Sequence, residues 1–127
     1  MSAKILLIED DEAIVETLRV MLESRGFAVE VLEDCDEGAT QIVAMAPDLL
    51  ILDLHLPGRD GMEIYKNIKD SGRLADMPVI VLSSLSKRHI LAAAESGGTV
   101  LAEDTVFSKP IDPEGFISKI EKMLAGE

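Results

Sequence analysis

Four short apolar segments of this sequence each end in polar or charged residues that could do chemistry. In chain order, these residues are Glu9, Asp10, Asp53, Ser83 and Lys109. Asp53 poses the sharpest question, because it directly follows the unbroken apolar run 49–52. A buried carboxylate without a partner is costly and would normally become protonated. Asp53 therefore either lies just outside the core beside a partner or takes part in a reaction.

The apolar segments alternate with helical patterns along the chain. Short apolar runs predict strands at residues 5–8, 27–31, 49–54, 79–82 and 106–107. Apolar residues at helical spacing predict helices that include residues 14–22, 39–46, 62–68, 90–94 and 116–124. Three of the strands are apolar throughout, as is typical of parallel strands that helices cover on both faces. This order predicts an α/β fold with an open, doubly wound, five-stranded parallel sheet.

The last predicted helix has the clearest start. Asp112 can cap its N-terminus, and Pro113 suits its first position. Its expected buried face comprises Phe116, Ile117, Ile120, Met123 and Leu124. The strand at 27–31, in contrast, alternates between apolar and other residues, which predicts a half-exposed strand near a sheet edge.

The predicted fold places the acidic residues together. In an open α/β sheet, functional residues gather beyond the carboxyl ends of the strands, so we expect Glu9, Asp10 and Asp53 on one rim. At about 4 Å and an effective dielectric constant of about 20, each pair of carboxylates would repel by roughly 4 kcal/mol. This arrangement needs a cation, and oxygen ligands favour a hard ion such as Mg²⁺.

Two further residues complete the predicted site. Lys109 supplies a fixed positive charge, and Ser83 supplies a hydroxyl that can donate a hydrogen bond. Together with a metal ion, they could hold a phosphoryl group bonded to a carboxylate, which makes Asp53 the nucleophile. Phosphoryl transfer depends on positioning and on neutralising charge, and it needs little acid–base chemistry. The rim thus predicts Mg²⁺-dependent formation of an aspartyl phosphate.

Four sequence segments give a resemblance that covers essentially the whole chain. They are ILLIEDDE (5–12), LLILDLHLPGRDG (49–61), PVIVLSS (78–84) and VFSKP (106–110), in this order and with suitable separations. On these segments the chain resembles the receiver domains of two-component response regulators. The resemblance implies a flavodoxin-like (βα)5 fold with strand order 2-1-3-4-5. It also implies a signalling module that supports its own phosphorylation and dephosphorylation, and not an enzyme.

The resemblance further implies a donor and a metal. Asp53 would accept the phosphoryl group from a phosphohistidine on a sensor histidine kinase or a histidine phosphotransfer protein. Asp10, Asp53 and the backbone carbonyl of His55 would bind Mg²⁺ directly, and Glu9 would help through water.

The resemblance assigns the remaining site residues to the phosphate and to switching. Lys109 would pair with the acceptor and with its phosphate. Ser83 would hydrogen-bond a phosphate oxygen and draw in the loop after the fourth strand. Phosphorylation, which adds roughly −1.5 to −2 charges, would then switch the face formed by helix 4, strand 5 and helix 5 for binding of a downstream target. The sequence does not name that target.

This sequence departs from the family pattern at three places. Val106 occupies the position where the family usually has a switching Tyr or Phe, and we expect Phe107 to point to the opposite face of the sheet. Ser83 stands where Thr is commoner, which keeps the hydroxyl. The stretch from Ser83 to Lys109 is longer than usual and carries Gly97–Gly98. This lengthening is similar to receivers attached to EAL-type cyclic-di-GMP phosphodiesterases.

Several candidate residues also have an ordinary structural interpretation. The acidic run 9–12 could mark a solvated helix start, and beside the other segments we keep this interpretation for Asp11 and the residue after it. We expect the His55 side chain to line the rim of the site without a role of its own. We expect His89 on a helix surface and Tyr65 in packing.

Two other functions compete with a receiver. A haloacid-dehalogenase-like phosphotransferase also uses an Asp nucleophile at a strand end, but it needs a second Asp where this chain has His55, and it needs room for a cap domain. A flavodoxin-like electron carrier needs a phosphate loop rich in Ser, Thr and Gly after the first strand. Here the acidic run 9–12 would repel a phosphate without metal.

The composition sets broad limits on location and partners. The 127 residues suit one receiver domain, 1–127, and we expect no output domain and no leader sequence. A net charge of −12 argues against direct binding to nucleic acid or to anionic membranes. Cys35 is the only cysteine, which excludes an intramolecular disulfide and favours a reducing, cytoplasmic compartment.

Overall fold

The computed structural model describes residues 3–32, 39–56, 59–70, 72, 74, 76–98, 101 and 105–126. At residues 39, 55, 56, 59 and 60 the description covers the backbone alone. Cys35, Pro57 and Gly58 lie outside the described residues, as does part of the segment 95–105.

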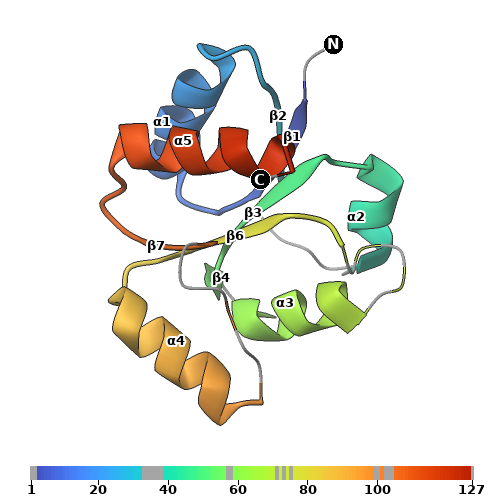
Figure 1. The fold of residues 1–127 in the computed structure, drawn as a ribbon, viewed down its shortest axis with the longest axis vertical. Helices are drawn as coiled ribbons and strands as arrows, with labels where there is room; N and C mark the ends of the chain where they lie inside the picture. Colours follow the sequence, from blue (N-terminus) through green and yellow to red (C-terminus); the bar gives the residue numbers. More distant parts are fainter. Residues whose placement is uncertain are drawn as a thin grey trace.

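Strands and helices alternate along most of the described chain, except that three strands follow one another between residues 49 and 60 (Figure 1). The strands are β1 (Lys4–Ile8), β2 (Ala28–Leu32), β3 (Leu49–Asp53), β4 (His55–Leu56), β5 (Arg59–Asp60), β6 (Val79–Ser83) and β7 (Val106–Ser108). The helices are α1 (Glu12–Glu23), α2 (Ala39–Met45), α3 (Gly61–Asp70), α4 (Lys87–Ser96) and α5 (Pro113–Leu124). Every predicted strand and helix has a counterpart, with ends that differ by a few residues.

The main sheet is parallel and has the strand order β2-β1-β3-β6-β7. This confirms the predicted order 2-1-3-4-5, because β6 and β7 are the fourth and fifth strands of this sheet. Helices α1 and α5 cover one face, and α2, α3 and α4 cover the other (Figure 1). The half-buried strand β2 lies at an edge, as predicted. Since all five strands run in the same direction, their carboxyl ends share one rim.

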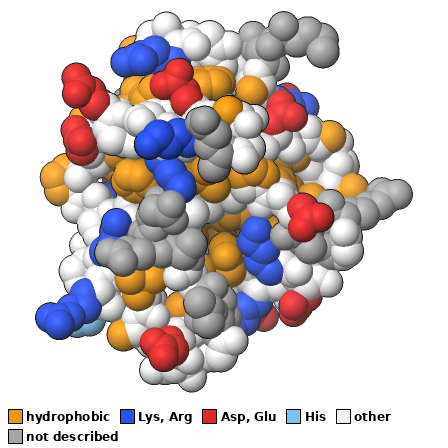
Figure 2. All heavy atoms as spheres, in the orientation of Figure 1, with side chains coloured by type: hydrophobic (Ala, Val, Ile, Leu, Met, Phe, Trp, Pro, Cys, Tyr) orange, Lys and Arg blue, Asp and Glu red, His pale blue; other side chains and the backbone are white. Residues whose placement is uncertain are grey.

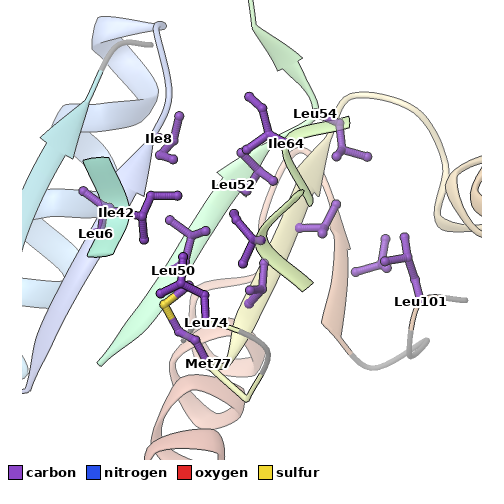
Figure 3. Packing of buried hydrophobic residues seen from close by; sticks show 14 of the residues in the cluster. Leu6, Ile8, Ile42, Leu50, Leu52, Leu54, Ile64, Leu74, Met77 and Leu101 are labelled. Atoms are coloured by element: carbon purple, nitrogen blue, oxygen red, sulfur yellow. The ribbon is translucent and has the colours of Figure 1, made fainter. Parts of the chain in front are cut away.

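The sheet lies between two apolar cores. Side chains of one strand point alternately to opposite faces. Leu6 and Ile8 of β1 therefore pack in the core under α2, α3 and α4, whereas Ile5 and Leu7 pack in the core under α1 and α5. Figure 3 shows the α2–α3–α4 core, in which side chains of β1 and β3 meet those of the helices. Burial on both faces explains why β1, β3 and β6 are apolar along their length.

Side-chain caps fix the starts of the two helices in the other layer. The Asp11 Oδ1 atom accepts a hydrogen bond from the Ala13 backbone N–H at 2.9 Å, which makes Asp11 the N-cap of α1. The Asp112 Oδ2 atom accepts one from the Gly115 N–H at 3.2 Å, and Pro113 is the first residue of α5. Both assignments confirm the structural interpretations made from the sequence.

The structure differs from the sequence predictions at a few boundaries. Strand β3 ends at Asp53, one residue earlier than expected. Asp60 pairs with His55 in the two-stranded ribbon β4–β5, which the sequence patterns did not predict. A strand of two residues is too short to show a periodicity, so the ribbon left no pattern to detect. Met123 and Leu124, in the last turn of α5, are only partly buried.

Charged side chains are interspersed on the surface. Figure 2 shows one face, on which acidic and basic groups are scattered between apolar patches, with no single large basic area. Among the residues that the structure describes, no helix combines the length and the apolar character that crossing a membrane requires.

Gly61→Ala should destabilise the fold. A Cβ atom on Gly61, the first residue of α3, would lie 2.4 Å from the Leu54 Cα atom, and backbone cannot move aside as a flexible side chain can. We expect a loss of about 1–3 kcal/mol in the free energy of unfolding, measured by urea denaturation. Gly72→Ala is the matched control, because nothing lies within 4 Å of its added Cβ. Equal unfolding midpoints for the two variants would contradict this prediction.

Candidate functional site

The carboxyl ends of the strands bring distant residues into contact. Glu9 follows β1, Asp53 ends β3 and Lys109 follows β7. The Lys109 Nζ atom lies 3.2 Å from Glu9 Oε2 and 3.1 Å from Asp53 Oδ2. One ammonium group therefore binds two carboxylates that are 100 and 56 residues away in the sequence. The rim predicted from the fold rule is present.

The contacts are largely shielded from solvent. The side chains of Glu9 and Asp53 are 1% and 3% exposed, and that of Lys109 is 19% exposed. Buried charges of this kind need an oppositely charged partner and hydrogen bonds. Glu9 Oε1 also accepts a hydrogen bond from the Asp11 backbone N–H at 3.2 Å. Asp10, in contrast, is exposed.

The pKa values of Glu9 and Lys109 are both raised, for different reasons. Burial, assisted by a hydrogen bond and repulsion from Asp53, raises the pKa of Glu9 to about 7. Burial alone would lower the pKa of Lys109, but its hydrogen bonds and charge interactions with Asp53 and Glu9 outweigh that effect and raise it. Glu9 is therefore protonated more easily than an exposed glutamate, although Lys109 lies beside it.

The acidic residues could hold a metal ion. Ligand oxygens of Glu9, Asp10 and Asp53 all lie within 4.8 Å of one another. All-oxygen ligands suit a hard divalent cation, and the exposed Asp10 leaves a side open to the waters that Mg²⁺ retains. The backbone of His55 lies in β4, two residues beyond Asp53, and its side chain lies outside the described atoms.

Ser83 completes the rim from β6. Its side chain is fully buried, and its Oγ atom accepts a hydrogen bond from the Leu85 backbone N–H at 3.0 Å. Its carbonyl accepts one from the Lys109 backbone N–H at 2.8 Å. The neighbouring Ser84 is exposed. The five predicted site side chains thus come from the ends of four strands that share one sheet.

Val106 and Phe107 take opposite faces of the sheet, as expected from strand alternation. Val106 is fully buried in the α2–α3–α4 core. Phe107 packs edge-on against Phe116 in the α1–α5 core, with ring centroids 5.1 Å apart. The Lys87 Nζ atom lies 6.0 Å from the centre of the Phe107 ring. The position of Val106 therefore carries neither a ring nor a polar group toward the site.

Sequence reasoning missed one contact beside the site. The Ser108 hydroxyl donates a hydrogen bond to the Leu85 carbonyl at 2.9 Å. No sequence signal marks this contact, because a serine next to a lysine is unremarkable and the two residues are 23 positions apart. His89 is exposed on α4 and Tyr65 packs against the core, both as expected.

Comparison with known proteins identifies relatives of the whole chain. The sequence profile of the response regulator receiver domain matches residues 5–121. The DNA-binding dual master transcriptional regulator RpaA of Synechocystis sp. is 32% identical over 122 residues, which cover 95% of this chain and 48% of that protein. Response regulator MprA of Mycobacterium tuberculosis is 32% identical over 127 residues, which cover 98% of this chain and 51% of that protein. The chain spans about half the length of these curated relatives.

A solved structure agrees with the sequence matches. The signal receiver domain of a signal transduction histidine kinase from Syntrophus aciditrophicus has a TM-score of 0.82 and 28% identity, and the match covers 98% of this chain and 92% of that one. These matches give no support to a haloacid-dehalogenase-like phosphotransferase. The suggested link to EAL-type phosphodiesterases stays a prediction.

Glu9→Gln should remove a pH dependence of the free energy of unfolding. Because folding raises the pKa of Glu9 from 4.5 to about 7, protonated Glu9 stabilises the fold fully below pH 4.5. This contribution is lost as the pH rises through about 7. Between these values the wild-type chain should lose on the order of 3 kcal/mol relative to Glu9→Gln. Urea unfolding at a series of pH values, in EDTA, measures the difference.

Glu16→Gln is the control for this pH series, because Glu16 is an exposed carboxylate on α1. Its stability should follow that of the wild type at every pH. A Glu9→Gln profile that also runs parallel to the wild type would show that Glu9 has an ordinary pKa in the folded chain.

Proposed function

The chain belongs to the response regulator receiver domain family of two-component systems, and from this premise we propose that Asp53 is its phosphoryl acceptor. The donor would be a phosphohistidine on a sensor histidine kinase or a histidine phosphotransfer protein. The observation that carries the proposal is the 3.1 Å contact between Lys109 Nζ and Asp53 Oδ2 inside a buried acidic rim. In this role the chain is a signalling module and not a classical enzyme.

The proposed transfer exchanges one phosphorus bond for another. An Asp53 carboxylate oxygen forms a P–O bond while the P–N bond of the phosphohistidine breaks. The electron pair of that bond stays on the imidazole nitrogen, which takes up a proton. Lys109 lies close enough to Asp53 to neutralise charge on the phosphoryl oxygens, and the Ser83 hydroxyl can donate a hydrogen bond to one of them.

Asp10, Asp53 and the backbone carbonyl of His55 would hold Mg²⁺, with Glu9 assisting through water. A bound Mg²⁺ supplies further neutralisation of charge on the phosphoryl oxygens. Two observations support this assignment. Ligand oxygens of Glu9, Asp10 and Asp53 lie within 4.8 Å of one another. Within the described part of the chain, Lys109 forms ion pairs with only the first and the last of these residues. Burial, with a smaller contribution from Asp53, raises the pKa of Glu9, and a cation bound beside these carboxylates would favour the ionised form of Glu9.

Phosphorylation would control binding at a distance from Asp53. The phosphoryl group adds roughly −1.5 to −2 charges to the rim. We propose that it shifts the β6–α4 loop, α4 and β7 between two packing arrangements. A downstream target would then bind the face formed by α4, β7 and α5 in one of these arrangements. The net charge of −12 favours a protein target over nucleic acid for this domain, and its lone cysteine fits the cytoplasm.

Asp53→Asn should abolish formation of a phosphoryl adduct. We expect intact-mass spectrometry to detect a single adduct on the wild-type chain after incubation with phosphoramidate, a small donor with the P–N bond of phosphohistidine. The adduct should require Mg²⁺, because uncompensated carboxylates repel the incoming phosphate. Asp70→Asn, which changes an exposed carboxylate at the end of α3, should leave the adduct intact.

Two results would contradict the proposal. The first is an adduct that still forms on Asp53→Asn but is lost when a different residue of the site is replaced, because that residue would then be the acceptor. The second is no adduct on the wild-type chain with phosphoramidate or acetyl phosphate in the presence of Mg²⁺.

A further inference from the structure

We propose that Ser108 positions the Ser83 hydroxyl for the phosphoryl group, acting through the backbone of Leu85, and so ties the site to the start of α4. This inference rests on the proposed function of Asp53. Ser108 touches none of the reacting atoms, which makes it a positioning residue. Its effect on the site passes through two hydrogen bonds, one at each end of Leu85.

Leu85 is held on both sides of its backbone. Its N–H donates to Ser83 Oγ at 3.0 Å, and its carbonyl accepts from Ser108 Oγ at 2.9 Å. The two serines are also register partners in the β6–β7 pairing. The backbone of Lys109 closes the arrangement by donating to the Ser83 carbonyl at 2.8 Å. The β6–α4 loop is thus clamped to β7 at the level of the acidic rim.

The clamp determines what the Ser83 hydroxyl can do. A serine hydroxyl has one proton to donate and two lone pairs that accept. The Leu85 N–H takes a lone pair, so the proton remains for donation to an oxygen in the site. Ser83 is fully buried, which shields its hydroxyl from bulk solvent. Holding Leu85 in place therefore preorganises Ser83 as a hydrogen-bond donor.

Ser108 and Val106 lie on the same face of β7, and only Ser108 has a polar side chain. Residues two apart on a strand point to the same face, so Ser108 and Val106 share one side of β7. Val106 is fully buried among apolar side chains and cannot hydrogen-bond to the loop. Ser108 is half-buried, and its hydroxyl reaches the loop directly. In this chain the polar link between β7 and the β6–α4 loop is therefore made by Ser108.

The clamp also reaches the first turn of α4. Leu85 immediately precedes Ser86, the N-cap of that helix, whose Oγ atom accepts from the His89 N–H at 3.3 Å. A displacement of the Leu85 peptide would move this cap with it. If Ser83 moves when it hydrogen-bonds a phosphoryl oxygen, Leu85 should move with it. That movement would displace the start of α4 and, through the hydrogen bond of Ser108, would also affect β7.

Ser108→Ala should loosen the Leu85 peptide in the unphosphorylated chain. We expect the Leu85 amide hydrogen to exchange about fivefold faster by NMR, the factor that the loss of one ordinary hydrogen bond gives. Exchange at Leu7 in β1, which has a strand on either side, should not change, and this separates local loosening from loss of global stability. Ser108→Thr keeps the hydroxyl and should behave as the wild type. Ser84→Ala removes an exposed hydroxyl from the same loop and should also have no effect.

A double-mutant cycle tests whether Ser108 acts through Ser83. Ser108→Ala should slow adduct formation with phosphoramidate and Mg²⁺ by about two- to tenfold. In a Ser83→Ala chain the same change should have no further effect on the rate, because the hydroxyl that it positions is gone. Ser108→Thr should restore the wild-type rate.

The outcomes separate this inference from the proposed function. Unchanged exchange at Leu85 in Ser108→Ala would overturn the clamp, whether or not Asp53 is phosphorylated. An equal slowing by Ser108→Ala with and without Ser83 would overturn the positioning role. Absence of any adduct on the wild-type chain would overturn the proposed function and the role of Ser108 in transfer with it, while the exchange result would still decide whether the clamp exists.

Discussion

The acidic rim of this protein depends on one ammonium group. Glu9 and Asp53 end neighbouring strands, where two buried carboxylates would otherwise repel each other across a medium of low polarity. Lys109 reaches both from the far side of β6, with contacts of 3.2 and 3.1 Å. The contact requires the strand order of the sheet, because β7 must lie next to β6 and end at the same rim. Burial raises the pKa of Glu9 even with Lys109 beside it, and repulsion from Asp53 adds to that effect.

Much of this arrangement could be predicted from the sequence, because the apolar runs that are easiest to recognise are those of the strands that position the rim. The apolar runs of β1, β3 and β6 are long enough, and apolar enough, to identify buried parallel strands. A fold rule then places whatever follows those runs at one rim. This rule is sufficient to predict that Glu9, Asp53 and Lys109 lie at one rim.

What the sequence could not predict depends on short or nonlocal geometry. Glu9 and Asp10 are adjacent acidic residues, and yet one is buried beside Lys109 while the other is exposed. Neither composition nor spacing distinguishes these two residues, because their burial depends on the direction in which each side chain points beyond the end of β1. The β4–β5 ribbon is too short to carry a pattern. The contact of Ser108 with Leu85 joins the last residue of β7 to the β6–α4 loop, and it depends on the β6–β7 register.

The separation of the two cores by the sheet has a consequence for how this sequence can change. Ile5 and Leu7 contact one helical layer, and Leu6 and Ile8 contact the other. Neighbouring residues of β1 therefore pack against different sets of side chains. Substitutions that share no partner tend to add in their effects on stability. Evolutionary drift could therefore repack the α1–α5 layer without compensating changes beneath α2, α3 and α4. An engineer could likewise select combinatorial libraries for the two layers separately and join the best variant of each in one gene.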